Sequence, residues 1–564
     1  MSAGPRGRTR KEPGGLRQLH GVGSQPVSGR SEAPGSFRAA AGPTGTFGRV
    51  IARVLVAFLL GVCGAFAFTP GPAAYVLPFS VAGFVLCMRG LRPRSAWLPG
   101  WAYGIGFQFV LLGWMRAVGP DAWVALSAIE SVFYAALGSA TAALLRLRAW
   151  PVLVAVAWLA VDVWRASWPF SGMPWGRLGF ATVDTPFAPA AAYVGIPGVS
   201  LLVGLLGTLI AWAVLRDRRR WRGSVLVPVV VLAAVCLPAL VPFGSASDGS
   251  VRVAVVQGNV PGDGTDILLD GPQVTRNHRD ATLDLAADVQ AGRVPRPDLV
   301  VWPENSTTVD PFNNLDINRD IVEASDAIGV PMLVGAMVDA TDPRDVLNQG
   351  IVWTPGVGAG DRYSKRHPVP FGEYIPWRDT VFSGTFGKLR LIPRDMLSGN
   401  RTEPLSIAGT RVADSICFDV GYDDGIRAQV LAGADLMVVQ TSNAMFVYTD
   451  QIQQQFAITR LRAIESHRAV AVAATNGITG LIGPDGRVLD QADPRTQAVL
   501  THELPLDTTV TPGIRLGIWI GRGAVVTTLL ALAFGAVTYR RNRRSGQAAA
   551  APEVDQPVLS GLPR

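Results

Sequence analysis

Cysteine and histidine are scarce in this sequence, and their scarcity excludes several kinds of site. The 564 residues include only 4 cysteines and 5 histidines. Three of the cysteines lie in long apolar stretches, so Cys417 is the only one in the more polar part of the chain. A lone thiol cannot form a disulfide within its own domain. With neither a paired-cysteine pattern nor a His-Glu-x-x-His motif, we expect no metal site.

Nucleotide and nucleic-acid signatures are absent as well. The sequence contains no Gly-x-x-x-x-Gly-Lys-[Ser/Thr] loop and no Gly-x-Ser-x-Gly elbow. Its formal net charge is +8, but the basic residues gather in the tails and in short arginine clusters between apolar runs. Membrane topology accounts for such clusters better than nucleic acid does. We therefore expect no nucleic-acid partner and no cofactor.

Charged residues are few, and long apolar runs take their place. Hydrophobic residues make up 49% of the chain and charged residues 17%, which is more apolar than an ordinary soluble protein. Most of the apolar runs approach the length of about 20 residues that a helix needs to cross hydrocarbon. They cover 50–68, 73–88, 97–115, 122–145, 150–165, 190–215, 224–242 and 517–539. The runs predict a seven-span membrane domain over 50–244 and an eighth transmembrane helix over 513–540, between disordered tails at 1–49 and 541–564.

Arginines follow every second apolar run. The clusters after the second, fourth, sixth and eighth runs include Arg89, Arg92, Arg94, Arg146, Arg148, Arg216, Arg218, Arg219, Arg220, Arg222, Arg540, Arg541, Arg543 and Arg544. The connections between these clusters are nearly neutral. By the positive-inside rule, both tails are cytoplasmic and the polar region between residues 245 and 512 is extracytoplasmic. A seven-helix alternative, with one short run re-entrant, leaves arginines on the wrong side.

The polar region changes to the pattern of an α/β domain. Short β-branched runs alternate with helix-like stretches at 277–290 and 316–327, which predicts strands and helices in turn. The predicted strands include 251–257, 299–301, 331–334 and 436–439. A further helix is expected near 452–469, followed by a buried strand at 471–474.

Three short motifs in this region carry reactive side chains. Glu304 ends Val301-Trp302-Pro303-Glu304, Lys365 ends Tyr363-Ser364-Lys365, and Cys417 follows a strand-like segment that runs into a turn. Together they supply a base, a cation and a soft nucleophile. The three motifs in this order resemble the signatures of the nitrilase superfamily, and 462–465 and 475–477 fit its C-terminal part. With the flanking apolar runs, the chain is similar to the apolipoprotein N-acyltransferase family of the bacterial envelope.

That resemblance implies a fold, a reaction and roles for individual residues. The expected fold is a multi-pass helical membrane domain with an extracytoplasmic αββα sandwich, in a bacterial cell membrane. Cys417 attacks an acyl ester of a membrane phospholipid and forms a thioester, and the acyl chain then passes to the α-amine of an apolipoprotein's diacylglyceryl-cysteine. Glu304 is the implied base, Lys365 the implied cation, and Glu373 in Val369-Pro370-Phe371-Gly372-Glu373 positions the lysine. We expect a monomer.

Some positions depart from the family or have two interpretations. Phe418 and Asp419 stand where the family often has Tyr and Glu, which leaves the roles of these two side chains open. Asn443 either orients the loop beyond the nucleophile or only shapes a turn. The aromatic segment from Trp168 to Trp175 is either an interfacial belt or a lipid entry.

Three other functions compete with acyl transfer. A membrane-anchored amidase could use the same triad with water as the acceptor. A lipoprotein-binding homologue could carry a decayed site. A Cys–His protease is weaker, because neither His367 nor His467 comes with a cysteine-protease signature around Cys417.

Overall fold

The computed structural model describes most of the chain between residues 43 and 548. The described residues are 43–216, 221–241, 243–244, 248–267, 270–378, 380, 389–390 and 392–548. Of the two predicted tails, residues 1–42 and 549–564 lie outside this part.

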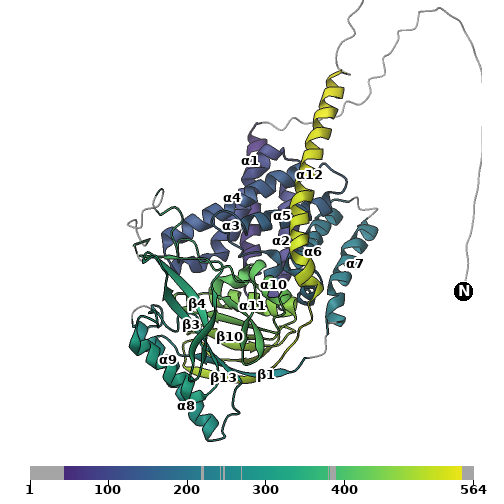
Figure 1. Cartoon of the computed structure of the whole chain (residues 1–564). Helices are drawn as coiled ribbons and strands as arrows, with labels where there is room; N and C mark the ends of the chain where they lie inside the picture. The colour runs from purple at the N-terminus through teal and green to yellow at the C-terminus, as the bar shows by residue number, and fades with distance from the viewer. Residues whose placement is uncertain are drawn as a thin grey trace, which may run out of the picture. The chain divides into compact units, whose positions relative to one another are not determined.

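Each predicted apolar run forms a helix (Figure 1). These helices are α1 (Pro43–Phe66), α2 (Leu77–Met88), α3 (Pro93–Leu111), α4 (Pro120–Leu144), α5 (Trp150–Arg165), α6 (Ala191–Val214), α7 (Trp221–Leu240) and α12 (Pro512–Ala548). Within the described residues, three are long and apolar enough to cross a membrane, over Pro120–Leu144, Ala188–Val214 and Pro512–Arg541. Val50–Phe66 and Pro72–Met88 are shorter apolar helices.

Two helices reach beyond the boundaries that hydropathy predicts. Helix α1 begins at Pro43, inside the predicted tail 1–49, and α12 continues to Ala548, inside the predicted tail 541–564. Proline is well suited to the first turn of a helix, where its missing N–H costs nothing. Arginine is a good helix former, so the helix continues where the apolar run ends.

The polar region forms two β-sheets packed face to face. In the described residues, the first sheet has seven strands in the order β13-β1-β2-β3-β4-β5, with β6 beside β4, and the second has six in the order β12-β11-β10-β9-β8-β7. The first sheet contains β1 (Ser250–Gln257), β2 (Leu299–Val301), β3 (Met332–Asp339), β4 (Asp345–Thr354), β5 (Gly358–Ser364), β6 (Asp395–Met396) and β13 (Ala498–Pro505). The second contains β7 (Leu405–Ile407), β8 (Thr410–Ile416), β9 (Leu436–Thr441), β10 (Val470–Ala474), β11 (Gly480–Ile482) and β12 (Val488–Gln491).

Helices cover the outer faces of both sheets, which gives the predicted αββα sandwich. Buried valines of β1 and β2 meet Val412, Ile416 and Val438 of the second sheet in one apolar layer. Helices α8 (Gly271–Gln290) and α9 (Leu315–Ile328) pack on the first sheet. Helices α10 (Asp424–Leu431) and α11 (Gln451–Ser466) pack on the second and share a core with the apolar helices (Figure 1).

Because many of the strands run in the same direction within each sheet, the loops that follow them lie at the same edge of that sheet. Strands β1, β2 and β3 are parallel, as are β8, β9 and β10. Strand β5 is antiparallel to β4, which is antiparallel to β3, so β5 runs in the direction of β3. The carboxyl ends of parallel strands meet at one edge of a sheet, which is where α/β folds place their ligands.

Candidate active site

The three predicted reactive residues each follow a strand at its carboxyl end. Glu304 comes three residues after β2, Lys365 directly after β5, and Cys417 directly after β8. The side chains of Glu304 and Lys365 are 2% and 0% exposed. Charged groups this deeply buried need partners, and the structure shows what those partners are.

Hydrogen bonds hold both carboxylate oxygens of Glu304. Lys365 Nζ donates to Oε1 at 2.9 Å and Asn348 Nδ2 donates to the same atom at 2.8 Å. The backbone N–H of Ser442 donates to Oε2 at 2.9 Å. Because a carboxylate has about four lone-pair sites, Glu304 keeps acceptor capacity for a proton while its orientation is fixed.

Lys365 lies between two carboxylates. Its Nζ also donates to Glu373 Oε1 at 2.6 Å, and Glu373 Oε2 accepts from the backbone N–H of Val369 at 2.8 Å. Burial alone would lower the pKa of Lys365, but the two carboxylates outweigh it and hold this pKa well above its usual value. Burial raises the pKa of Glu373, and Lys365 opposes that rise. The lysine is therefore a permanent cation, and Glu373 is in direct contact with it.

Cys417 stands on a strained turn. Its φ of 52° is in the left-handed region, which is rarely adopted by residues other than glycine. Burial raises the pKa of the thiol, the charge of Glu304 raises it further, and Lys365 lowers it. A hydrogen bond with Thr441 also lowers it. The resting thiol is protonated at neutral pH, so it needs a base at the moment of attack.

Asp419 joins the nucleophile turn to the lysine segment. Its Oδ2 accepts from the hydroxyl of Tyr363 at 3.0 Å and from the N–H of Arg366 at 3.2 Å, and its Oδ1 accepts from the N–H of His367 at 2.7 Å. The N–H of Ile416, just before the nucleophile, also donates to Oδ2, at 3.3 Å. The sequence left the role of this shorter acid open, and the structure places it as the shared acceptor on both sides of Lys365 and Cys417.

Phe418 packs against the loop between α5 and α6. Its ring stacks on Trp175 with centroids 5.7 Å apart and planes at 16°. The indole N–H of Trp175 donates to Gln454 at 2.9 Å, and the hydroxyl of Tyr422 donates to the carbonyl of Gly172 at 2.9 Å. Trp168, at the other end of the same aromatic segment, is 60% exposed. One end of the segment thus supports the nucleophile turn and the other faces outward.

Asn443 shapes the turn that follows Thr441. Its φ is 56°, and its Nδ2 donates to Gln451 and Gln455 of α11 at 3.0 Å each. The preceding residue, Ser442, is the one whose N–H binds Glu304. Asn443 therefore holds the backbone that orients the carboxylate.

Neither of the two histidines considered for a Cys–His protease, His367 and His467, is among the charged groups that act on the thiol of Cys417. The charged groups that act on Cys417 are Glu304, Lys365 and Glu373. His367 pairs with Asp424 at 2.8 Å, and His467 pairs with Asp507 at 2.6 Å. In the part of the chain that the structure describes, no group of three or more His, Cys, Asp or Glu side chains could hold a metal ion.

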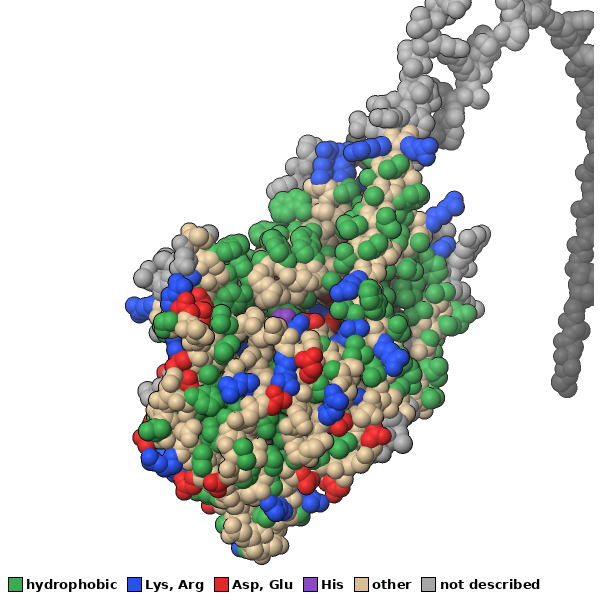
Figure 2. Space-filling view, in the orientation of Figure 1, with side chains coloured by type: hydrophobic (Ala, Val, Ile, Leu, Met, Phe, Trp, Pro, Cys, Tyr) green, Lys and Arg blue, Asp and Glu red, His purple; other side chains and the backbone are tan. Residues whose placement is uncertain are grey.

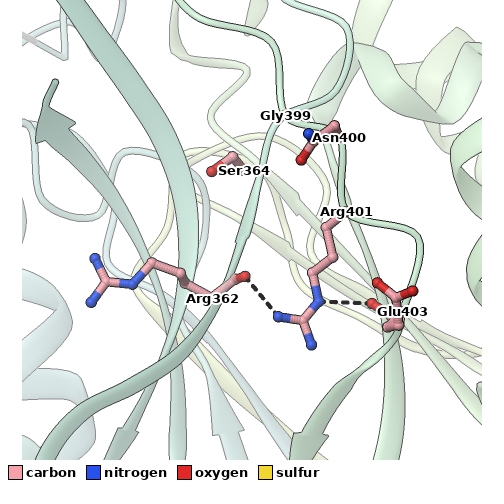
Figure 3. A pocket seen from close by; sticks show the side chains of 6 residues that line it. All are labelled: Arg362, Ser364, Gly399, Asn400, Arg401 and Glu403. Atoms are coloured by element: carbon pink, nitrogen blue, oxygen red, sulfur yellow. Dashed lines mark hydrogen bonds between the residues drawn. The ribbon is translucent and has the colours of Figure 1, made fainter. Parts of the chain in front are cut away.

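An open pocket of about 400 Å³ lies beside β5, the strand that precedes Lys365, but Glu304, Lys365 and Cys417 do not line it. Figure 3 shows its lining, which consists of Arg362, Ser364, Gly399, Asn400, Arg401 and Glu403. Side chains of successive strand residues point to opposite faces, so Ser364 faces away from Lys365. The N–H of Gly399 donates to the carbonyl of Lys365 at 2.8 Å. Through this hydrogen bond, the segment that lines the pocket holds the backbone of Lys365.

Sequence reasoning missed Asn348, Thr441 and Ser442. Asn348 lies on β4, a strand that the sequence did not predict, and Thr441 ends β9. Asn348 has no local motif, because its contact with Glu304 arises from strand pairing, whereas Thr441 and Ser442 stand directly before Asn443, the one residue of Thr441-Ser442-Asn443 that the sequence singled out.

Known proteins match the chain over both of its regions. A family model described as the apolipoprotein N-acyltransferase N-terminal domain matches residues 60–209, and one described as carbon-nitrogen hydrolase matches residues 252–511. An apolipoprotein N-acyltransferase from Mycolicibacterium smegmatis is 34% identical over 465 residues, covering 78% of this chain and 77% of that protein. One from Ralstonia nicotianae is 30% identical over 518 residues, covering 87% and 94%. An amidase structure from Nesterenkonia sp. covers 46% of this chain and 93% of its own, with 17% identity and a TM-score of 0.33.

Proposed function

The chain belongs to the apolipoprotein N-acyltransferase family, and from that premise we propose that it transfers an acyl chain from a membrane phospholipid to the α-amine of an apolipoprotein's diacylglyceryl-cysteine. The observation that carries the proposal is the buried cation Lys365, held between Glu304 and Glu373 and within electrostatic reach of Cys417.

In the first step, Cys417 becomes acylated. Glu304 takes the thiol proton as Sγ forms a bond to the ester carbonyl carbon of the phospholipid. Lys365 stabilises the negative charge that develops on the carbonyl oxygen, a kind of contact typically worth a factor of about 100 or more in rate. The ester C–O bond then breaks, Glu304 returns the proton to the leaving alcohol, and a thioester and a lysophospholipid remain.

In the second step, the amine replaces the thiol. The α-amine of the apolipoprotein attacks the thioester carbonyl and loses a proton to Glu304, and the S–C bond breaks as Cys417 is reprotonated. Glu304 thus acts as base and acid in turn within each step. Water is a competing acceptor, and the burial of Glu304 and Lys365 limits its access.

The placement of the catalytic domain suits lipid substrates. We propose that the apolar helices over 50–244 and 513–540 span a bacterial cell membrane, with the domain over 245–512 on the extracytoplasmic face. Figure 2 supports this orientation, because Lys and Arg appear without Asp or Glu at the end of the helices remote from the sandwich. One copy of the chain supplies every proposed reacting group, which fits a monomer.

Contacts between the helices and the sandwich keep the site beside the membrane. Arg177 forms a two-pronged ion pair with Asp423, at 2.8 and 2.9 Å. Glu465 of α11 accepts from the N–H of Ile196 in α6 at 2.8 Å. The turn that carries Cys417 therefore rests on the helical part, close to the membrane surface where the ester bonds of a phospholipid lie.

The first experiment gives the purified protein a defined phospholipid and no acceptor. Mass spectrometry should find one acyl chain on the peptide that contains Cys417 and none in the Cys417→Ala variant. An unmodified Cys417, together with turnover of small amides, would support the amidase instead. If Cys417→Ala restored lipoprotein N-acylation to a depleted strain, a binding protein with a decayed site would be the correct interpretation.

A further inference from the structure

A second pocket lies at the far end of the helical part from the catalytic site. Its volume is about 440 Å³, and its lining residues are Arg89, Gly90, Leu91, Ala142, Leu145, Arg146, Trp150 and Leu215. They belong to the ends of α2, α4 and α6 and to the beginning of α5. In α6, Ile196 contacts the catalytic domain while Leu215 lines the pocket. The two are 19 residues apart, or about 28 Å along a helix, which is close to the thickness of the hydrocarbon core of a bilayer.

The pocket combines two cations with apolar walls. Arg89 and Arg146 line it, and in the part of the chain that the structure describes no carboxylate lies within ion-pair distance of either one. The guanidinium of Arg146 lies over the ring of Tyr539 in α12, 5.2 Å from its centroid. Arg53 adds a third guanidinium to the same rim, where it donates to the carbonyl of Arg89 at 2.9 Å. Among the described residues, positive charge is thus concentrated at this pocket without a paired carboxylate.

The remaining lining residues indicate that the ligand of this pocket has an apolar part as well as an anionic one. Leu91, Leu145 and Leu215 supply apolar surface beside the two arginines, and Trp150 has an indole ring of the kind that favours the headgroup layer. An arginine fork binds phosphate oxygens in a two-pronged geometry. A soluble anion would use the arginines but not the leucines, whereas a phospholipid uses both.

We propose that this pocket binds the phosphate-bearing headgroup of an anionic phospholipid in the cytoplasmic leaflet. Basic pockets between transmembrane helices on the cytoplasmic side are known to suit such headgroups. The view in Figure 2, where that end of the helices shows Lys and Arg and no acidic side chain, agrees with this ligand. The inference rests on the orientation in the proposed function. The lipid bound here is separate from the acyl donor, which reaches Cys417 from the opposite leaflet.

The test compares two double variants with the same change of charge. Arg89→Gln with Arg146→Gln removes both pocket cations, and Arg92→Gln with Arg148→Gln removes two exposed arginines of the same connections that do not line the pocket. Each protein is placed in phosphatidylcholine nanodiscs that contain increasing amounts of spin-labelled phosphatidylglycerol, and the immobilised lipid is measured. Each basic residue near the surface contributes about fivefold to the binding of an anionic lipid wherever it lies, so both double variants should lose up to about thirtyfold through charge alone. The pocket variant should lose roughly a further tenfold or more, because only its arginines donate hydrogen bonds to the phosphate.

Four outcomes overturn the proposal. Equal losses in the two double variants would mean a diffuse surface effect, and no loss in the pocket variant would mean that the pocket is not a lipid site. Competition by inorganic phosphate at millimolar concentration would assign the arginines to a free anion. Spin-labelled phosphatidylcholine bound with the same dependence on Arg89 and Arg146 would show that the anionic headgroup is not recognised.

The same samples separate this inference from the proposed function. Formation of the Cys417 thioester is measured in each nanodisc preparation, and we expect it in both double variants. Loss of the thioester from the unsubstituted protein would contradict the acyltransferase mechanism. Arginine-dependent retention of phosphatidylglycerol in that case would still support the pocket.

Discussion

At the scale of single residues, the proposed catalytic centre is built on a buried cation between two carboxylates. Glu373, Lys365 and Glu304 are joined by contacts of 2.6 and 2.9 Å, and the thiol of Cys417 is the next group in line. Breaking a buried ion pair by removing one partner typically costs about 3–5 kcal/mol, because a charge is left without compensation. In the proposed mechanism the lysine therefore has two roles, since it compensates the charge of the two acids and stabilises the oxyanion.

The Glu304→Gln substitution tests whether the carboxylate of Glu304 acts as a base, because it removes the basic group and keeps the size of the side chain. An amide has nearly the same shape, but it cannot accept the thiol proton. General acid–base catalysis contributes about 10² to 10⁴ in rate, so the rate of thioester formation should fall by that range. The measurement is a single-turnover assay with phospholipid in excess. A loss smaller than tenfold would contradict the assignment of Glu304 as the base.

The pH dependence of Cys417 alkylation follows from its raised pKa. An ordinary thiol has a pKa of about 8.5 and its reactivity levels off above that pH. Burial and Glu304 raise the pKa of Cys417, so its thiolate fraction should keep growing as the pH rises beyond about 9. We expect the second-order rate with iodoacetamide to increase throughout this range, with no plateau. A plateau near neutral pH would mean a thiolate formed in advance, and would contradict proton transfer to Glu304 during the attack.

The reactive residues could be predicted from the sequence because each belongs to a contiguous motif. Glu304, Lys365 and Cys417 stand in three such motifs, and the resemblance carried Glu373 to its place beside the lysine. Asn348 has no such motif, because it reaches Glu304 only through the pairing of β4 with β3 and β5.

At the scale of elements, β5 explains why part of the first sheet was missed. Its sequence, Gly358 to Ser364, contains two glycines and an exposed aspartate, residues that are rare in strands. The strand exists because β4 pairs with it, for example Gly350 with Tyr363. Strands β1, β2 and β9 could be predicted because both of their faces are largely buried, and their sequences are mostly apolar.

The loop between α5 and α6 supports the nucleophile turn. Arg165 donates to the carbonyl of Met173 at 2.9 Å and to Glu130 of α4 at the same distance, which anchors the loop to the helices. Farther along, Trp175 stacks on Phe418, the neighbour of Cys417. The helical part therefore contributes to the shape of the site and is more than a membrane anchor.

Substitutions of Trp175 should reveal this support. Trp175→Ala removes the stack and the hydrogen bond to Gln454, and a displacement of about 1 Å at a reacting group can cost roughly 100-fold in rate. We expect thioester formation to fall by roughly tenfold to 100-fold in Trp175→Ala and by much less in Trp175→Phe, which keeps a ring. Trp168→Ala is the control, since its side chain is 60% exposed in the same loop. Equal rates in all three variants would contradict a role for the stack.

At the scale of the whole molecule, the arginine pattern and the fold both favour the proposed orientation. The connection after α2 and that after α4 carry arginines, while α6 and α12 contact the catalytic domain near their first residues, at Ile196 and Ile514. Hydropathy and charge could predict the number and order of the helices. Where α1 begins and α12 ends could not be predicted, because helix formation does not stop where hydrophobicity does.

Labelling of single cysteines tests the orientation. Val357→Cys lies on an 82% exposed turn of the catalytic domain, and Arg92→Cys lies in the connection between α2 and α3. In intact spheroplasts a membrane-impermeant maleimide should label the first variant and not the second, and both should react after lysis. The unsubstituted protein corrects for the 4 native cysteines. Labelling of Arg92→Cys before lysis would contradict the proposed orientation.

The most direct test of the central claim is a chase of the acylated enzyme. The protein is first loaded with a labelled acyl chain from phospholipid, freed of excess lipid, and mixed with a peptide that begins with diacylglyceryl-cysteine. The proposed mechanism predicts that the label leaves Cys417 and appears as an amide on the peptide's α-amine in equal amount. Release of the label only as free fatty acid, or formation of the amide while the Cys417 adduct persists, would contradict it.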